Sequence, residues 1–167
     1  MKGLFLSLII VLLLAGCHRE PWQHSSIRNG NGQHDLAKLT YPASNPNSGI
    51  ELAITRHGKE ILGYIHVHSY TLPLYQENPH ETFLTIETEQ ASQTFVIPLF
   101  EGGQRARLSP ICLDYLLQTL ELKPSVTLSS GHFSETLNSG NFHRHYDALL
   151  REPSRLLPES LVTFELY

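Results

Sequence analysis

The chain has few of the residues on which common functional motifs depend. Its 167 residues include two cysteines, one tryptophan and one methionine, and only 17% are charged. The sequence contains no Cys-x-x-Cys pair, glycine-rich phosphate loop, dinucleotide fingerprint or Gly-x-Ser-x-Gly elbow. Only three aspartates occur, which limits the carboxylate chemistry available to the chain. These absences argue against nucleotide-binding folds, thioredoxin-like redox motifs and the common serine-hydrolase arrangement.

Positive charge is also scarce. The formal net charge is −4, from 12 basic and 16 acidic residues, and the basic residues form no cluster. A protein that binds nucleic acid normally presents a basic patch or stripe. The composition therefore predicts that the chain has no nucleic-acid partner.

The longest apolar run is too short to cross a membrane. It extends from Leu4 to Leu14, interrupted only by Ser7, whereas a spanning helix needs about 20 apolar residues. Lys2 precedes it, and the small residues Ala15-Gly16 and then Cys17 follow it. A basic start, a short apolar stretch and a small-residue site are typical of a secretory signal peptide.

The segment Leu13-Leu14-Ala15-Gly16-Cys17 resembles the lipobox of bacterial lipoproteins. The resemblance implies cleavage after residue 16, lipidation of Cys17 and attachment to a cell membrane through that lipid. An aspartate after the cysteine commonly retains such proteins in the inner membrane, and here the residue is His18. This favours the outer membrane of a Gram-negative source, with the domain facing the periplasm or the cell surface. The alternatives are a secretory signal with an incidental cysteine and an uncleaved anchor.

The composition of the segment after Cys17 predicts that the mature chain consists of a tether followed by a domain. Residues 17–48 are rich in glycine, asparagine, serine and proline and show no hydrophobic period, which favours a lipidated flexible tether. Trp22, Leu36 and Leu39 could instead dock on the domain. Residues 49–167 have the size of one globular domain.

Alternating apolar residues predict two hairpins in the first half of that domain. Their strands are expected at residues 50–55 and 60–72, and at residues 82–89 and 94–100. Gly58 can take the positive φ that the first turn needs. Pro98 has no backbone N–H to donate to a neighbouring strand, which predicts that its strand lies at a sheet edge or bulges there.

Helical periodicity is confined to the second half. Ser109-Pro110 is typical of a helix start and Lys123-Pro124 of a helix end. A second helix is predicted by the spacing of Phe142, Tyr146 and Leu149. Further strands are expected at residues 125–129, 133–137 and 160–167. The order predicts an α+β fold, with a mostly antiparallel sheet or sandwich and two packed helices.

The ten histidines make metal binding the sharpest chemical hypothesis. On an extended strand, His66 and His68 would point to the same face, with their Cα atoms about 7 Å apart. Two such imidazoles suit a zinc or copper site. The third ligand could be His80, His132, His143, His145 or a carboxylate such as Glu87. The alternative is a solvated strand face on which Tyr64 and Tyr70 flank the histidines.

Two sequence features could support catalysis, but each has a simpler explanation. Ser129-Ser130-Gly131-His132 brings serine and histidine together, yet a turn between strands explains these residues equally well. Cys112 lies near a helix start among apolar neighbours, which favours a buried hydrophobe over a reactive thiol. No catalytic residue is predicted, and an envelope hydrolase that uses Ser130 or His132 remains the enzyme alternative.

The favoured function is therefore a non-catalytic binding or assembly module of the cell envelope. Its partner could be an envelope protein, a glycan or a lipid, with Tyr64 and Tyr70 as candidate contact residues. No cofactor is required by this hypothesis. The alternative, a metal-binding lipoprotein, needs zinc or copper at His66 and His68.

Overall fold

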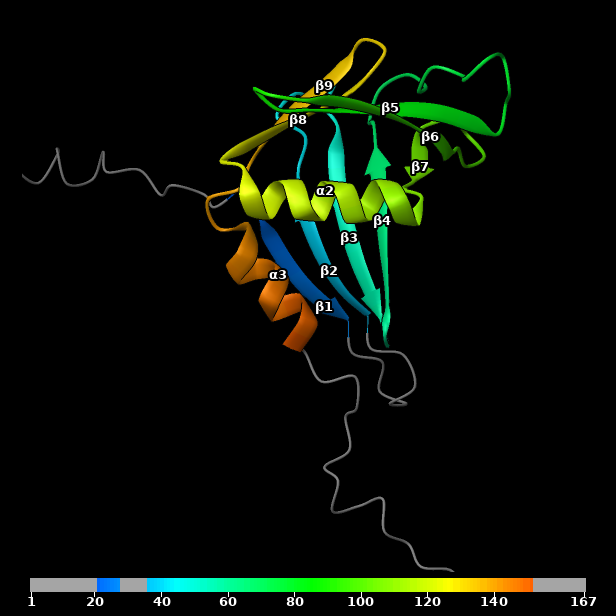
Figure 1. The fold of residues 1–167 in the computed structure, drawn as a ribbon. Coiled ribbons are helices and arrows are strands. Elements are labelled where there is room, and N and C mark those ends of the chain that lie inside the picture. Colours follow the sequence, from blue (N-terminus) through cyan, green and yellow to red (C-terminus); the bar gives the residue numbers. More distant parts are fainter. Residues whose placement is uncertain (1–20, 28–35, 152–167) are drawn as a thin grey trace, which may run out of the picture.

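The computed structural model describes residues 21–27 and 36–151 (Figure 1). The predicted lipidation site at Cys17 and the strand predicted for residues 160–167 lie outside this range. In the described residues the chain forms nine strands and two helices, which confirms the α+β fold. No helix in these ranges is both long and apolar enough to span a membrane.

The first sheet has five antiparallel strands in the order β1-β2-β3-β4-β7. Its strands are β1 (Gln23–Ile27), β2 (Leu36–Tyr41), β3 (Glu51–His57), β4 (Glu60–His66) and β7 (Arg105–Arg107). The predicted hairpin joins β3 to β4, and Gly58 has the expected positive φ of 61°. Strand β4 ends six residues before the predicted end, at His66. Tyr70, farther along, has a left-handed φ of 64°, which an extended strand does not allow.

The second sheet has four antiparallel strands in the order β6-β5-β8-β9. Its strands are β5 (Glu81–Glu87), β6 (Ser92–Pro98), β8 (Ser125–Ser130) and β9 (Phe133–Asn138). Pro98 lies on the edge strand β6, as predicted from its lack of a backbone N–H. Phe95 of the same strand packs against Tyr115, with ring centroids 5.4 Å apart.

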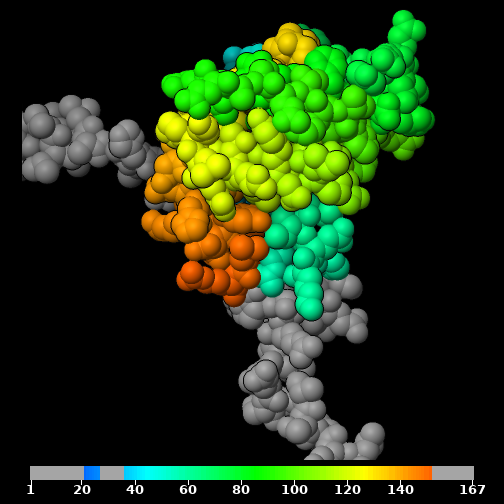
Figure 2. Space-filling model, viewed as in Figure 1, coloured from blue at the N-terminus to red at the C-terminus, as the bar shows by residue number. Residues whose placement is uncertain are grey.

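Two helices complete the described fold. Helix α2 (Pro110–Leu122) begins at the predicted cap, where the Ser109 hydroxyl accepts from the Cys112 amide at 3.4 Å. Helix α3 (Phe142–Arg151) buries Phe142 and Leu149, as its spacing predicts. Helix α2 lies across the first sheet, between the second sheet and α3 (Figures 1 and 2).

The predicted tether at residues 17–48 is wrong for the part that the structure describes. Strands β1 and β2 from this segment add to the first sheet beside β3. Trp22 is only 2% exposed, and its indole nitrogen donates to the Asn138 carbonyl at 2.7 Å. Leu39 is fully buried. The tether was predicted from local composition, whereas these residues are ordered by pairing and packing with distant parts of the chain.

A single hydrophobic core joins both sheets and both helices. The buried side chains of β3 and β4 face α2, where Gly63 allows close approach. A Cβ atom at this position would lie 2.8 Å from the Leu108 and Leu113 side chains. The alternate residues of these strands therefore lie on the opposite face of the first sheet, which carries the candidate site.

Candidate functional site

The first two residues of the candidate site are placed together by the β3–β4 hairpin. Glu51 at the start of β3 is the cross-strand partner of His66 at the end of β4. Directly opposed residues of an antiparallel pair point to the same side of the sheet. The carboxylate and the imidazole therefore share the face that lies away from α2.

His68 joins this pair from just beyond the end of β4. The Val67 amide donates to the Gln104 carbonyl at 2.9 Å, which holds the chain after the strand. The rings of His66 and His68 have centroids 4.6 Å apart, and His68 Nε2 lies 3.4 Å from Glu51 Oε2. The structure thus confirms that the two predicted histidines lie together.

Glu51, His66 and His68 form a compact set of potential metal ligands. One donor atom from each residue lies within 4.8 Å of the other two. Among the residues that the structure describes, no other three histidine, cysteine or carboxylate side chains meet in this way. Two imidazoles and one carboxylate can hold a zinc ion and leave a coordination position free.

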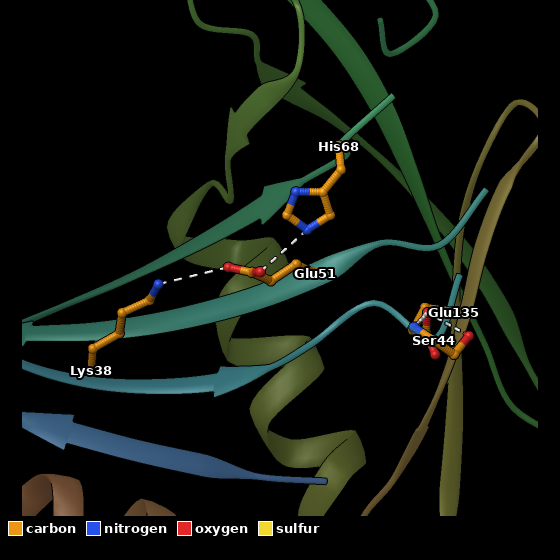
Figure 3. A network of polar contacts seen from close by, with 5 residues as sticks. All are labelled: Lys38, Ser44, Glu51, His68 and Glu135. Carbon is orange, nitrogen blue, oxygen red and sulfur yellow. Dashed lines mark hydrogen bonds and ion pairs between the residues drawn. The ribbon is translucent and has the colours of Figure 1, made fainter. Parts of the chain in front are cut away.

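Lys38 on β2 provides a competing partner for the carboxylate (Figure 3). Its Nζ lies 3.7 Å from Glu51 Oε1. The other carboxylate oxygen, Oε2, is the one that faces His68. The Glu51 side chain is only 19% exposed, so this ion pair is screened less than a fully exposed one. The carboxylate is therefore already held in one orientation without a metal.

The surroundings favour the neutral form of His66. Partial burial lowers the pKa of this imidazole from its ordinary value, and nearby His68 lowers it further. Glu51 raises the pKa, whereas the cations Arg105 and Lys38 lower it. A histidine binds metal through the lone pair of its neutral ring. The net lowering of the His66 pKa therefore suits a metal ligand.

The residues predicted as third ligand are not part of this cluster. His132 contacts Phe133, with ring centroids 3.9 Å apart, and His143 lies 3.5 Å from Asp147 on α3. His80, His145 and Glu87 are also absent from the three-residue set. The sequence did carry a signal for Glu51, because the hairpin turn that pairs His57 with Glu60 also places residue 51 opposite residue 66.

Tyr64 and Tyr70 do not lie on one strand face beside the histidines, as the alternative prediction had placed them. Tyr64 lies beside Phe100, with centroids 6.1 Å apart, and under the guanidinium of Arg105. Tyr70 is 72% exposed and instead approaches His132, with centroids 6.2 Å apart. The chain leaves the strand geometry before Tyr70, so the alternation of side chains that would place Tyr70 on the same face as Tyr64 ends with β4.

The residues considered for catalysis occupy structural positions. Cys112 is fully buried, and burial raises the pKa of its thiol to about 12, far from a reactive thiolate. The Ser130 hydroxyl is buried and has no hydrogen-bond partner among the residues that the structure describes. Since its side chain is fully buried, it is closed to an external substrate. The described geometry therefore does not form a Ser-His pair for hydrolysis.

A second polar network in Figure 3 is structural. Glu135 on β9 is only 4% exposed. Its carboxylate accepts from the Ser44 amide at 2.8 Å and from the Ser44 hydroxyl at 3.1 Å. These bonds attach the loop between β2 and β3 to the second sheet.

The fold and the site together define a class, an α+β protein with two antiparallel sheets and a His₂Glu cluster on the outer face of one. Comparisons with protein-family models, with curated proteins and with solved structures find no match. The functional argument therefore depends on the residues and their geometry.

Proposed function

We propose that this chain is a lipid-anchored protein of the bacterial envelope whose domain binds Zn²⁺ or Cu²⁺ without catalysing a reaction. The lipobox resemblance at Cys17 supports the anchor. The arrangement of Glu51 opposite His66, with His68 Nε2 at 3.4 Å from the carboxylate, carries the metal assignment. The function is thus a binding module whose ligand is a transition-metal ion.

Zinc and copper suit these donors best. Imidazole is a good ligand for both ions, and a carboxylate oxygen completes a three-ligand set. The strand pairing already brings these side chains together, so binding requires little rearrangement of the backbone. Metal binding must, however, compete with the attraction between Lys38 and Glu51. This competition favours exchangeable binding over a permanent structural metal.

The cluster gives more support to binding than to metal-assisted hydrolysis. A catalytic zinc ion needs an open position, and a nearby base commonly assists the attacking water. Glu51 is the single carboxylate of the cluster and is used as a ligand. The other charged side chains described near it, Lys38 and Arg105, are cations and cannot act as that base.

The metal assignment is tested by titration of the purified, detergent-solubilised protein with Zn²⁺ and Cu²⁺. Isothermal titration calorimetry should give one equivalent of bound metal, and the variant His66→Ala/His68→Ala should lose this binding. The matched control is His143→Ala/His145→Ala, which also removes two histidines separated by one residue. Binding that is equal in both double variants, or absent from the natural sequence, would reject the assignment.

The anchor is tested separately in bacteria fed an alkyne fatty acid. The natural sequence and Cys112→Ala should both acquire the label, whereas Cys17→Ala should not. Cys112→Ala is the matched control because it removes the only other cysteine. A label that persists in Cys17→Ala would contradict lipidation at this residue.

A further inference from the structure

Arg105 extends the candidate metal site onto the neighbouring strand. Strand β7 pairs with β4, and Arg105 is the cross-strand partner of His66. Both side chains therefore project from the same face of the first sheet, with their Cβ atoms about 5 Å apart. Arg105 is also among the charges that influence His66. It is thus a direct neighbour of the proposed metal ligands.

Two aromatic rings hold the guanidinium group of Arg105. Its Cζ atom lies 4.2 Å from the centroid of the Tyr64 ring and 5.6 Å from that of Phe100. Such stacking restricts a long, flexible side chain while leaving the N–H groups at the edge of the guanidinium free to donate. The arginine is therefore partly organised for a ligand before one binds.

The described part of the chain supplies no hydrogen-bond acceptor or carboxylate partner for the Arg105 side chain, whose contacts are aromatic. Arg107, two residues along the same strand, differs in this respect. Its Nη2 lies 3.7 Å from Glu60 Oε1. Both arginines are exposed, but only Arg107 is paired with a carboxylate within the described residues. Arg105 has donors available for an external anion.

The charges around the site also favour an anion once a metal is bound. The cluster supplies one carboxylate, Glu51, while Lys38 and Arg105 are both positive. A divalent ion would leave this part of the surface with a net positive charge. Nearby like charges repel, even where solvent reduces the repulsion. An anion that binds together with the ion would offset it.

We propose that the metal held by Glu51, His66 and His68 binds a small carboxylate as a further ligand, and that Arg105 hydrogen-bonds to this carboxylate. This inference rests on the proposed metal binding. A three-ligand zinc site keeps a position for an external ligand, and the planar guanidinium matches the two oxygens of a carboxylate. The site then recognises a metal–carboxylate pair instead of a metal ion alone.

The test compares the zinc affinity of the purified full-length protein in acetate and in perchlorate at equal ionic strength. After correction for zinc acetate in solution, acetate should raise the affinity of the natural sequence about fivefold, near the upper limit for an exposed charge interaction. Arg105→Gln should lose this increase. Arg107→Gln, the matched control on the same strand, should retain it.

Cobalt(II) in place of zinc gives a readout that is independent of affinity, because its visible absorption responds to a change of ligand. Acetate should change the spectrum of the natural sequence and of Arg107→Gln, and change that of Arg105→Gln only at higher acetate concentration. Zinc binding without an acetate effect, or with an equal effect in both arginine variants, would overturn the carboxylate inference alone. The absence of zinc binding would overturn the carboxylate inference, and the absence of both zinc and copper binding would overturn the proposed function as well.

Discussion

Cys112 shows how burial decides the chemistry of a single residue. Its thiol has no exposed surface, and the raised pKa keeps it protonated at neutral and mildly alkaline pH. In the folded Cys17→Ala variant, which keeps Cys112 as its single cysteine, we expect no reaction with a thiol reagent at pH 8. Full reaction should follow denaturation, which exposes the thiol and restores its ordinary pKa. Rapid labelling of the native protein, measured by mass spectrometry, would contradict this burial.

Glu135 provides a second test at the residue scale. Glu135→Ala removes the buried acceptor of two hydrogen bonds from the exposed Ser44 and should cost about 1–3 kcal/mol of unfolding free energy. Glu135→Gln keeps one acceptor oxygen and should cost less. Urea unfolding measures both, with Glu121→Ala on the exposed side of α2 as the control. A Glu135→Ala variant as stable as this control would show that the network contributes little.

The cluster of Glu51, His66 and His68 was only partly predictable at this scale. The i, i+2 spacing of His66 and His68 is a local property, and the structure confirms that the two rings meet. Glu51 lies 15 residues before His66, so its role depends on hairpin register rather than on spacing. That register follows from the turn at Gly58. Residue type allows any nearby carboxylate as the third member of the cluster, and only strand pairing singles out Glu51.

At the scale of elements, prediction worked where the local signal was strong. The proline and serine at the start of α2, the apolar spacing of α3 and the proline on the edge strand β6 each have a direct physical effect on the backbone. Strand β1, with the sequence QHSSI, has no apolar alternation. It is ordered by its pairing with β2, which residues 23–27 alone do not reveal.

Strands β1 and β2 precede the expected start of the domain at Gly49 but belong to the first sheet, which gives a prediction about their role in folding. A fragment that begins at the expected boundary, Gly49, should not unfold cooperatively, because β3 loses its partner β2 and the core loses Trp22 and Leu39. A fragment that begins at His18 retains these parts and should unfold with a sharp transition. Circular dichroism during urea unfolding measures both fragments. Equal cooperativity would show that β1 and β2 are dispensable for folding.

At the scale of the whole molecule, the two sheets depend on one core. Trp22 packs near Tyr41 of the first sheet and donates to Asn138 of the second, while α2 contributes buried leucines between them. The order of strands and helices in the sequence predicted the fold class. The division into two sheets depends on which distant strands pair, and hydrophobic periodicity does not encode that choice locally.

Metal binding should therefore stabilise the molecule as a whole, although the ligands lie on one sheet. At a free Zn²⁺ concentration 100 times the dissociation constant, a ligand that binds only the folded state adds about 2.7 kcal/mol to the unfolding free energy. The unfolded chain also carries histidines, so weak binding to that state would reduce the gain.

The natural sequence should show this gain as a higher urea midpoint, followed through the fluorescence of Trp22, the only tryptophan. His66→Ala/His68→Ala should unfold at the same midpoint with and without zinc, whereas His143→Ala/His145→Ala should behave as the natural sequence does. The described contacts of Trp22 include neither histidine pair. A zinc-dependent shift of the urea midpoint in Trp22 fluorescence would therefore report on unfolding of the shared core. A zinc-dependent shift that survives loss of His66 and His68 would place the responsible metal elsewhere in the chain.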